Sequence, residues 1–102
     1  MNIIPKKNGS NFYIYFQGEL DEYSAGKTRK QVDTILDENV SCDRVIFNLS
    51  ELSFMDSTGI GFLLGRYKKM KNYNTPVYIE CCNPSIDKIV NISGLYNIMP
   101  KI

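Results

Sequence analysis

Residues 44–70, RVIFNLSELSFMDSTGIGFLLGRYKKM, form the stretch of sequence that decides the fold. The stretch begins with a short apolar run, Arg44–Leu49, which has polar residues on both sides and is typical of a buried parallel strand. Apolar residues then recur at helical spacing from about Ser57 to Tyr73, and this spacing predicts an amphipathic helix. A buried strand that leads into such a helix indicates an α/β fold.

Strands and helices continue to alternate on both sides of this stretch. We predict a short strand at residues 1–7, an aromatic strand at Phe12–Phe16, a helix from about Ser24 to Glu38, a strand at Val77–Cys81, a helix that begins at Asn83-Pro84 and stops at Gly94, and a candidate short strand within residues 95–102. The predicted order is β-β-α-β-α-β-α with a candidate final β. This order describes one α/β domain over residues 1–102, with a mixed, mostly parallel sheet of four or five strands packed with amphipathic helices.

Composition restricts the function classes that are open to the chain. Lys and Arg number 12 and Asp and Glu 11, so the net charge of +1 offers no basic excess for direct nucleic-acid binding. Histidine is absent, which excludes a Ser-His-Asp or Cys-His site, and there is no CxxC pair for zinc. Cys42, Cys81 and Cys82 make a poor disulfide framework and indicate reduced cysteines in the cytoplasm. Since no apolar run is long enough for a membrane helix, we expect a cytoplasmic binding domain that is not an enzyme and has no cofactor or metal.

Asp56-Ser57-Thr58-Gly59 lies where a strand gives way to the N-terminus of the central helix. The first turn of a helix has unpaired N–H groups and a partial positive charge, so a phosphate added to a hydroxyl there would meet favourable donors. Spacing alone allows two interpretations. Either Asp56 and Ser57 serve only as a helix cap, which is the commoner case, or Ser57 is also a phosphorylation switch.

Helical projection divides the central helix into two faces. One face holds five residues that we predict to be core, namely Ile60, Leu63, Leu64, Tyr67 and Met70. Phe62 and Arg66 project to the opposite side, where we expect solvent. Gly61 and Gly65 each cost about 1 kcal/mol of helix stability relative to Ala, so tight packing within the fold or the close approach of another surface should account for them.

Several motifs together resemble one protein family. The segments Gly18–Asp21, Leu52–Gly61, Leu64–Lys68 and Ser93–Leu95 are similar, in this order, to the anti-sigma factor antagonists of the STAS domain family. The similarity is greatest to the antagonists of the anti-sigma F factor in endospore-forming bacteria. The family usually continues into a C-terminal helix, which we expect to be lacking in this chain because it stops at Ile102.

The resemblance implies a mechanism and two partners. Antagonists of this kind bind an anti-sigma factor that is also a serine kinase, and the sigma factor that is released activates transcription, in this case for sporulation. The kinase phosphorylates the serine that matches Ser57, which weakens binding, and a serine phosphatase restores the binding form. Asp21 matches an acidic neighbour of that serine. Thr58 stands where serine is common in the relatives and is the rival acceptor.

The residues and the resemblance together predict a partner-binding surface around Ser57, with Phe62 as an exposed apolar anchor. The surface comprises Glu19, Asp21, Tyr23, Asp56, Ser57, Thr58, Gly59, Gly61, Phe62 and Arg66. The alternative within the family is a small-molecule or signalling-complex sensor that does not act on a sigma factor. An enzyme with Cys81 or Cys82 as its nucleophile would lack a histidine base, and a two-component receiver domain would need clustered carboxylates after its first strand.

Overall fold

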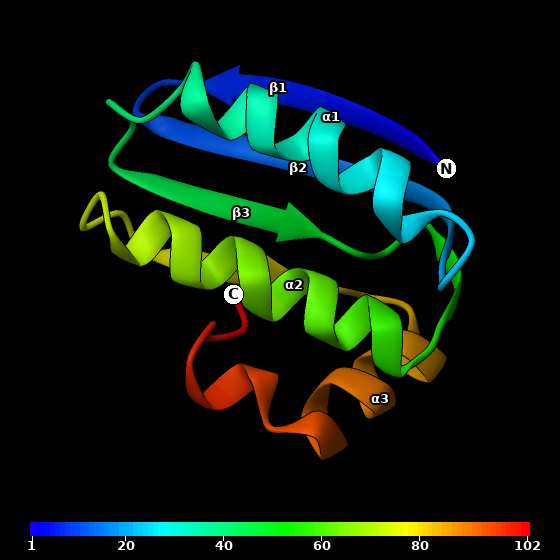
Figure 1. Ribbon diagram of the computed structural model, residues 1–102. Helices are drawn as coiled ribbons and strands as arrows, with labels where there is room; N and C mark the ends of the chain where they lie inside the picture. The colour runs from blue at the N-terminus through cyan, green and yellow to red at the C-terminus, as the bar shows by residue number, and fades with distance from the viewer.

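The long strand β2 organises the sheet because it pairs with three other strands. In the computed structural model, which describes residues 1–102, β2 (Asn11–Leu20) lies antiparallel to the edge strand β1 (Asn2–Asn8) and parallel to β3 (Arg44–Asn48) and β4 (Leu52–Met55). β5 (Val77–Glu80) extends the sheet on the far side of β3, also in parallel. The result is a mixed, mostly parallel sheet of five strands (Figure 1).

β2 changes partner part-way along its length. Its first half, Asn11–Tyr15, is in register with β3, and its last residues, Gly18–Leu20, pair with β4, with a bulge between Gly18 and Glu19. Gly18 has a φ of 111°, which residues with a Cβ rarely adopt, and its N–H donates to the carbonyl of Glu51 at 3.3 Å. This glycine therefore allows one strand to hold two successive partners on the same edge.

The helices α1 (Ala25–Asp37) and α2 (Ser57–Lys71) lie side by side over one face of the sheet, and α3 (Pro84–Ser93) lies beyond α2 (Figure 1). This one-sided arrangement follows from strand order, because β2, β3 and β5 are parallel neighbours and right-handed crossovers between them fall on the same face. Alternate strand residues point toward the helices and are buried in the core, among them Phe12, Ile14, Phe16, Val45, Phe47, Val77 and Ile79.

The predicted fold class is confirmed, although two elements differ from the expected order. β4 is not predicted, because Leu52–Met55 is only four residues long and the middle of the strand is exposed. The candidate final strand is instead a short 3-10 helix at Leu95–Asn97, followed by a single bridge between Ile79 and Lys101. None of the helices combines the length and the apolar character that crossing a membrane requires.

α3 begins and ends where the sequence predicts. The side chain of Asn83 caps the helix by accepting from two N–H groups of the first turn, at 3.1 and 3.4 Å, and the helix stops at Gly94. Just before this helix, Cys81 is buried and Cys82 is exposed, as expected for neighbouring residues at a strand end. Turn chemistry and strand alternation are therefore reliable guides in this part of the chain.

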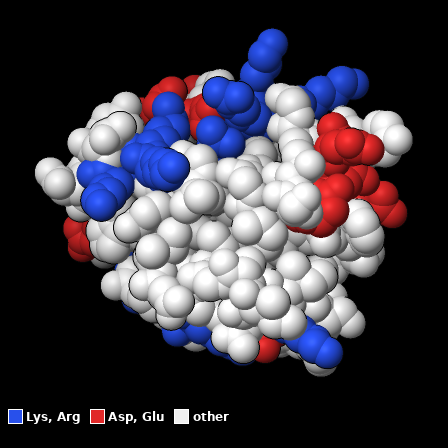
Figure 2. Space-filling model, turned by 60° about the horizontal axis from the view of Figure 1, so that its bottom comes forward, with Lys and Arg blue, Asp and Glu red and all other residues white.

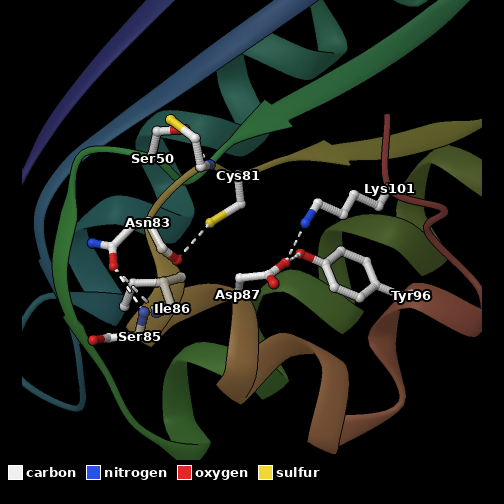
Figure 3. Close-up of polar contacts among 9 residues, drawn as sticks. Ser50, Cys81, Asn83, Ser85, Ile86, Asp87, Tyr96 and Lys101 are labelled. Atoms are coloured by element: carbon white, nitrogen blue, oxygen red, sulfur yellow. Dashed lines mark hydrogen bonds and ion pairs between the residues drawn. The ribbon is translucent and has the colours of Figure 1, made fainter.

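A polar cluster of Asp87, Tyr96 and Lys101 holds the C-terminal segment against α3 (Figure 3). The carboxylate of Asp87 accepts hydrogen bonds from the Tyr96 hydroxyl at 2.5 Å and from the Lys101 ammonium at 2.8 Å. The bond from Lys101, and then the bond from Tyr96, lowers the pKa of Asp87. The pKa of Lys101 is raised by its bond to Asp87, and the pKa of Tyr96 is raised by burial and then by Asp87. Backbone hydrogen bonds of 3.0 Å at both the N–H and the carbonyl of Ile79 complete the attachment.

Candidate functional site

Two loops leave the sheet side by side and bring the predicted switch residues together. Leu20 at the end of β2 is in register with Met55 at the end of β4. Asp21 and Asp56 are the next residues along the chain, so they lie at the same edge of the sheet. The carboxyl ends of parallel strands are where functional groups collect in α/β folds.

Asp56 caps α2 and leaves the neighbouring hydroxyl accessible. Its Oδ1 accepts from the N–H of Gly59 at 3.1 Å, and its backbone carbonyl accepts from the N–H of Ile60 at 3.1 Å. Ser57 is the first residue of the helix, and both Ser57 and Thr58 are exposed. Their N–H groups precede the first intrahelical hydrogen bond, so they remain available to an added group. A cap at Asp56 and an accessible acceptor at Ser57 are therefore compatible.

Gly59 lets the first turn of α2 pack closely against the ends of β2 and β4. A Cβ at this position would lie 2.6 Å from the carbonyl oxygen of Leu20 and 2.5 Å from Cγ of Met55, and real Cβ atoms do not approach other atoms so closely. Gly59 is buried, so it does not itself present a contact to a partner as the sequence suggests. It positions the turn that carries Ser57.

Asp21 holds the loop between β2 and α1 in shape. Its carboxylate accepts from the backbone N–H groups of Ser24 and Tyr23, each at 3.0 Å, and these bonds, that of Ser24 first, lower the pKa of Asp21. Ser24, near which the helix is predicted to begin, stands at the N-cap position of α1, but its hydroxyl donates to the carbonyl of Glu19 at 2.8 Å and does not cap the helix. Asp21 therefore presents a fixed negative charge at the edge shared with Asp56.

The surface on this side of the molecule divides into charged and uncharged areas (Figure 2). Acidic side chains gather at the end where β2 leads into α1 and β4 leads into α2, and basic side chains gather over α1 and at the far end of α2. Glu19, Asp21 and Glu22 belong to the acidic end, and the ring of Tyr23 beside them is 87% exposed. No group of three or more His, Cys, Asp or Glu side chains is arranged to hold a metal ion.

The prediction that Phe62 is an exposed anchor is wrong. Its side chain is 5% exposed, and its ring packs edge-on against Phe16 with 6.1 Å between the ring centroids. Arg66, one turn later, is also buried rather than solvated. Its guanidinium lies 5.0 Å from the centroid of the Phe62 ring, and its Nε lies 2.8 Å from Oδ1 of Asp33 on α1. Burial lowers the pKa of Arg66, and the negative charge of Asp33 opposes this effect.

α1 is the reason that this side of α2 is covered. Leu63 and Met70 are buried as predicted, but the core stripe of α2 also includes Phe62 and Arg66 because α1 packs beside them. The other expected core residues, Ile60, Leu64 and Tyr67, are only half-buried at the margin of the core. The helix has apolar residues on both flanks, so its own sequence does not reveal which flank α1 covers.

A groove of about 520 Å³ between α1 and α2 is lined by Gly61 and Gly65. A Cβ at either glycine would meet no atom within 4 Å, so packing inside the fold does not account for them. Thr58 and Arg29 also border the groove. Arg29 is a lining residue that the sequence indicates only weakly, through its (i, i+4) spacing to Asp33, and in the structure the two side chains lie 4.0 Å apart.

The sequence matches the STAS domain over residues 2–102. The chain belongs to the STAS domain family. This STAS domain is 33% identical over 87 residues to the anti-sigma F factor antagonist of Paenibacillus polymyxa, and the match covers 85% of this chain and 74% of that relative. It is 27% identical over 99 residues to the anti-sigma-B factor antagonist of Bacillus subtilis, with 97% of this chain and 88% of that relative covered.

Solved structures agree with this assignment. The anti-sigma factor antagonist SpoIIAA in its unphosphorylated form superposes on this STAS domain with a TM-score of 0.78 at 25% identity, over 99% of this chain and 88% of that chain. The Bacillus cell fate determinant SpoIIAA in its phosphorylated form gives a TM-score of 0.70 at 25% identity, over 99% and 91% of the two chains. Sequence and fold therefore make this STAS domain a member of the anti-sigma factor antagonists, as its motifs predict.

Proposed function

We propose that this STAS domain activates transcription by binding an anti-sigma factor, and that phosphorylation of Ser57 switches the binding off. The unphosphorylated domain binds an anti-sigma factor that is also a serine kinase, and the sigma factor is released. The kinase then phosphorylates Ser57, the complex dissociates, and a serine phosphatase restores the binding form. The domain acts in the cytoplasm as a regulator and not as an enzyme, because its partners supply the chemistry.

The observation that carries the proposal is the accessible Ser57 hydroxyl at the N-terminus of α2. Asp56 already satisfies the N–H of Gly59, and the N–H groups of Ser57 and Thr58 remain free for a phosphate. A phosphate at this position requires no core side chain to move, since Ser57 is exposed. The modification would therefore change the surface charge and leave the fold intact.

The acidic setting of Ser57 explains how a phosphate would weaken binding. It adds about −1.5 to −2 charges next to Asp21 and Asp56, which follow the paired ends of β2 and β4. A like charge on the partner about 4 Å away would then cost roughly 4 kcal/mol at an effective dielectric constant near 20. At about 1.4 kcal/mol for each factor of ten, this corresponds to on the order of a thousandfold loss of affinity.

The partner surface that we propose omits three residues of the surface predicted from the sequence. Phe62, Gly59 and Arg66 are buried and serve to position α2. The accessible contacts are Tyr23 and the acidic residues beside it, together with Thr58 and the backbone of Gly61. Because a Cβ at Gly61 or Gly65 would meet no atom of the fold within 4 Å, the close approach of a partner to this groove is the explanation that remains for these two glycines.

The test combines the purified domain with its anti-sigma factor kinase. With ATP present, we expect mass spectrometry to locate one phosphate on Ser57 and calorimetry to show weakened binding. Ser57→Ala should bind with wild-type affinity whether or not ATP is present. Ser57→Asp should bind on the order of tenfold to a thousandfold more weakly, since a carboxylate carries less charge than a phosphate.

Thr58→Ala is the matched control for this experiment, because Thr58 is the adjacent exposed hydroxyl. It should be phosphorylated and should bind like the wild type. If Ser57→Ala is phosphorylated at the wild-type rate, the acceptor is a different residue. If Ser57→Asp binds as tightly as the wild type, charge at this position does not control the complex.

We propose a sporulation sigma factor as the target, on the strength of the similarity to an anti-sigma F factor antagonist. The similarity to an anti-sigma-B factor antagonist makes a sigma-B type system the alternative. Competition between the two anti-sigma factors from the source organism for one preparation of the domain would distinguish them. Preferential binding of the sigma-B type anti-sigma factor would contradict the sporulation assignment.

A further inference from the structure

The face of the sheet that points away from the helices carries an organised layer of side chains. Tyr13 on β2, Ile46 on β3 and Tyr78 on β5 lie side by side in register. Ile46 is fully buried, yet it does not belong to the core cluster that packs under the helices. It is covered instead within this outer face, in which Tyr13 and Tyr78 are its half-buried neighbours. The outer face therefore has an apolar centre without a helix over it.

Aromatic contacts fix the shape of this centre. The rings of Tyr13 and Tyr15 stack with 6.1 Å between centroids and 17° between planes. The guanidinium of Arg44 lies 5.2 Å from the centroid of the Tyr78 ring, and its Nε donates to the side-chain carbonyl of Asn11 at 3.0 Å. These contacts hold broad side chains flat across three strands, which produces a surface suited to packing against another sheet.

The charges on this face are separated along the strand direction. Arg44 precedes the row of Tyr13, Ile46 and Tyr78, and Lys6 lies in that row at its β1 edge, so both cations lie nearer the start of β2 than the carboxylates do. Glu80 lies one row further on, and Glu51 accepts a hydrogen bond from a side chain near the end of β2 at 3.0 Å. The end of the face toward the start of β2 is thus its positive end and the opposite end is its negative end, and the tyrosine row lies between Arg44 and the carboxylates.

None of these four charged residues has an ion-pair partner within the chain. All the ion pairs of the molecule lie on the helix side or at the C-terminal segment: Arg29–Asp33, Arg66–Asp33, Lys69–Asp37 and Lys101–Asp87. The charges of the open face have only neutral partners, such as the amide of Asn48, which donates to Glu80 at 2.6 Å. A complementary surface would have to come from another molecule.

We infer that the open sheet face, defined by Lys6, Tyr13, Arg44, Tyr78, Glu51 and Glu80, binds a second copy of this chain. A two-fold axis that runs across the strands turns the second copy end for end. Its negative end then faces the positive end of the first copy, and the two tyrosine layers meet in the middle. A face of four strands, with about 4.8 Å between strands, offers on the order of 400 Å² per copy, about half the 800 Å² of a standard interface, so the dimer is weak.

This dimer leaves the switch residues free, because Ser57 lies on the helix side of the sheet (Figure 1). Both copies present their α1–α2 grooves outward, on opposite sides of the pair. Given the proposed function, one dimer would offer two binding surfaces to anti-sigma factors. The dimer itself does not depend on that function, and the experiment below measures it without any partner.

Sedimentation velocity over a concentration series tests the inference directly. We expect wild-type protein to pass from monomer to dimer between about 10 μM and 1 mM, the range of a weak interface. Lys6→Glu combined with Arg44→Glu makes the face uniformly negative, and Glu51→Lys combined with Glu80→Lys makes it uniformly positive. Each variant alone should dimerise at least about tenfold more weakly. In each case like charges would face one another at both ends of the interface, where the wild type has opposite charges.

An equimolar mixture of the two charge variants should recover dimers, since their faces are again complementary. In the matched control, Lys27→Glu combined with Lys30→Glu takes the place of the Lys6→Glu/Arg44→Glu variant. The control has the same net charge as that variant, but its changes lie at exposed positions of α1. This control should dimerise with itself like the wild type and should not dimerise with the Glu51→Lys/Glu80→Lys variant beyond the level of that variant alone. Equal association in both mixtures would mean that net charge, and not the sheet face, drives the contact, and would overturn the inference.

Two further results would overturn it. One is a wild-type protein that stays monomeric at about 1 mM, above the range of even weak specific dimers. The other is tight binding of a single-stranded oligonucleotide, measured by fluorescence anisotropy and lost in Tyr13→Ala, because the tyrosine layer would then be a base-stacking platform.

Discussion

Phe62 contributes to the stability of the fold because its ring is buried between α2 and the sheet. It packs between Phe16 of the sheet and Arg66 of its own helix, and almost none of its surface is accessible. We expect Phe62→Ala to lower the free energy of unfolding by about 3–5 kcal/mol, because a buried aromatic side chain is lost and a cavity is left. Urea denaturation followed by circular dichroism measures this change.

Phe54→Ala is the control for that measurement, because Phe54 is 49% exposed on β4. It should change the free energy of unfolding by less than about 1 kcal/mol. Equal effects of the two substitutions would contradict the assignment of Phe62 to the core. Loss of partner binding by a folded Phe62→Ala protein would then reflect a displaced α2, since the ring does not reach the surface.

The glycines of α2 have opposite roles despite their proximity. Gly61→Ala should raise the free energy of unfolding by about 0.5–1 kcal/mol, because its position is open and Ala favours helix. Gly59→Ala should lower it, because the new Cβ would collide with the Leu20 carbonyl. Thermal unfolding of the two variants measures whether the free energy of unfolding rises for Gly61→Ala and falls for Gly59→Ala. If Gly61→Ala is more stable yet binds the anti-sigma factor more weakly, the open glycine serves binding; unchanged affinity would exclude Gly61 from the contact.

At the scale of elements, the cluster of Asp87, Tyr96 and Lys101 joins α3 to the C-terminal segment. The pKa of Asp87 is lowered from 3.8, so its stabilising contribution is present at neutral pH and is lost as the pH falls through the folded-state value. The pKa values of Tyr96 and Lys101 are raised, so their contributions are lost only as the pH rises through their folded-state values, above about 10. The attachment is therefore at full strength between the ordinary pKa values of 3.8 for an Asp and 10.0 for a Tyr.

Asp87→Asn tests this linkage. The variant should be less stable than the wild type at pH 7, and the difference should shrink below about pH 3.8, where the wild-type carboxylate takes up a proton. Denaturant titrations at pH 7 and pH 2.5 measure the difference. Asp43→Asn is the control, because its carboxylate has neither a hydrogen-bond nor an ion-pair partner in the fold. A difference for Asp87→Asn that is constant with pH would show that the cluster does not stabilise the charged form.

Some helices and strands of this chain can be predicted from the sequence, and others cannot. α3 is predictable because Asn83-Pro84 and Gly94 mark its ends with local chemistry. β4 is not, because its four residues acquire strand geometry only by pairing with β2 beyond the bulge at Gly18. The rotation of α2 is likewise set by a distant element, since the ion pair from Arg66 to Asp33 joins two helices that are far apart in sequence. Long-range pairing decides both features.

At the scale of the whole molecule, the candidate site was largely predictable in position and less so in composition. Asp21, Asp56 and Ser57 come together at one sheet edge, as expected for residues that follow parallel strands. Helical projection places Phe62 and Arg66 on the surface because one helix contains no information on its neighbours, and the motif around Ser57 does not indicate that Gly59 is buried. The roles of the other seven residues in binding a partner remain predictions for the experiments above.

The pairing of β2 with β4 has a consequence for how fast the proposed switch would respond. Asp21 follows directly on β2, and Asp56 follows directly on β4, which is paired with β2. The two carboxylates beside Ser57 are therefore both held by the same rigid part of the sheet. A phosphate added there cannot relieve its repulsion by driving the flanks apart. If Ser57 is phosphorylated as we propose, no segment would have to rearrange before a partner meets the modified surface, and we expect the response to be limited by the dissociation and diffusion of the partner.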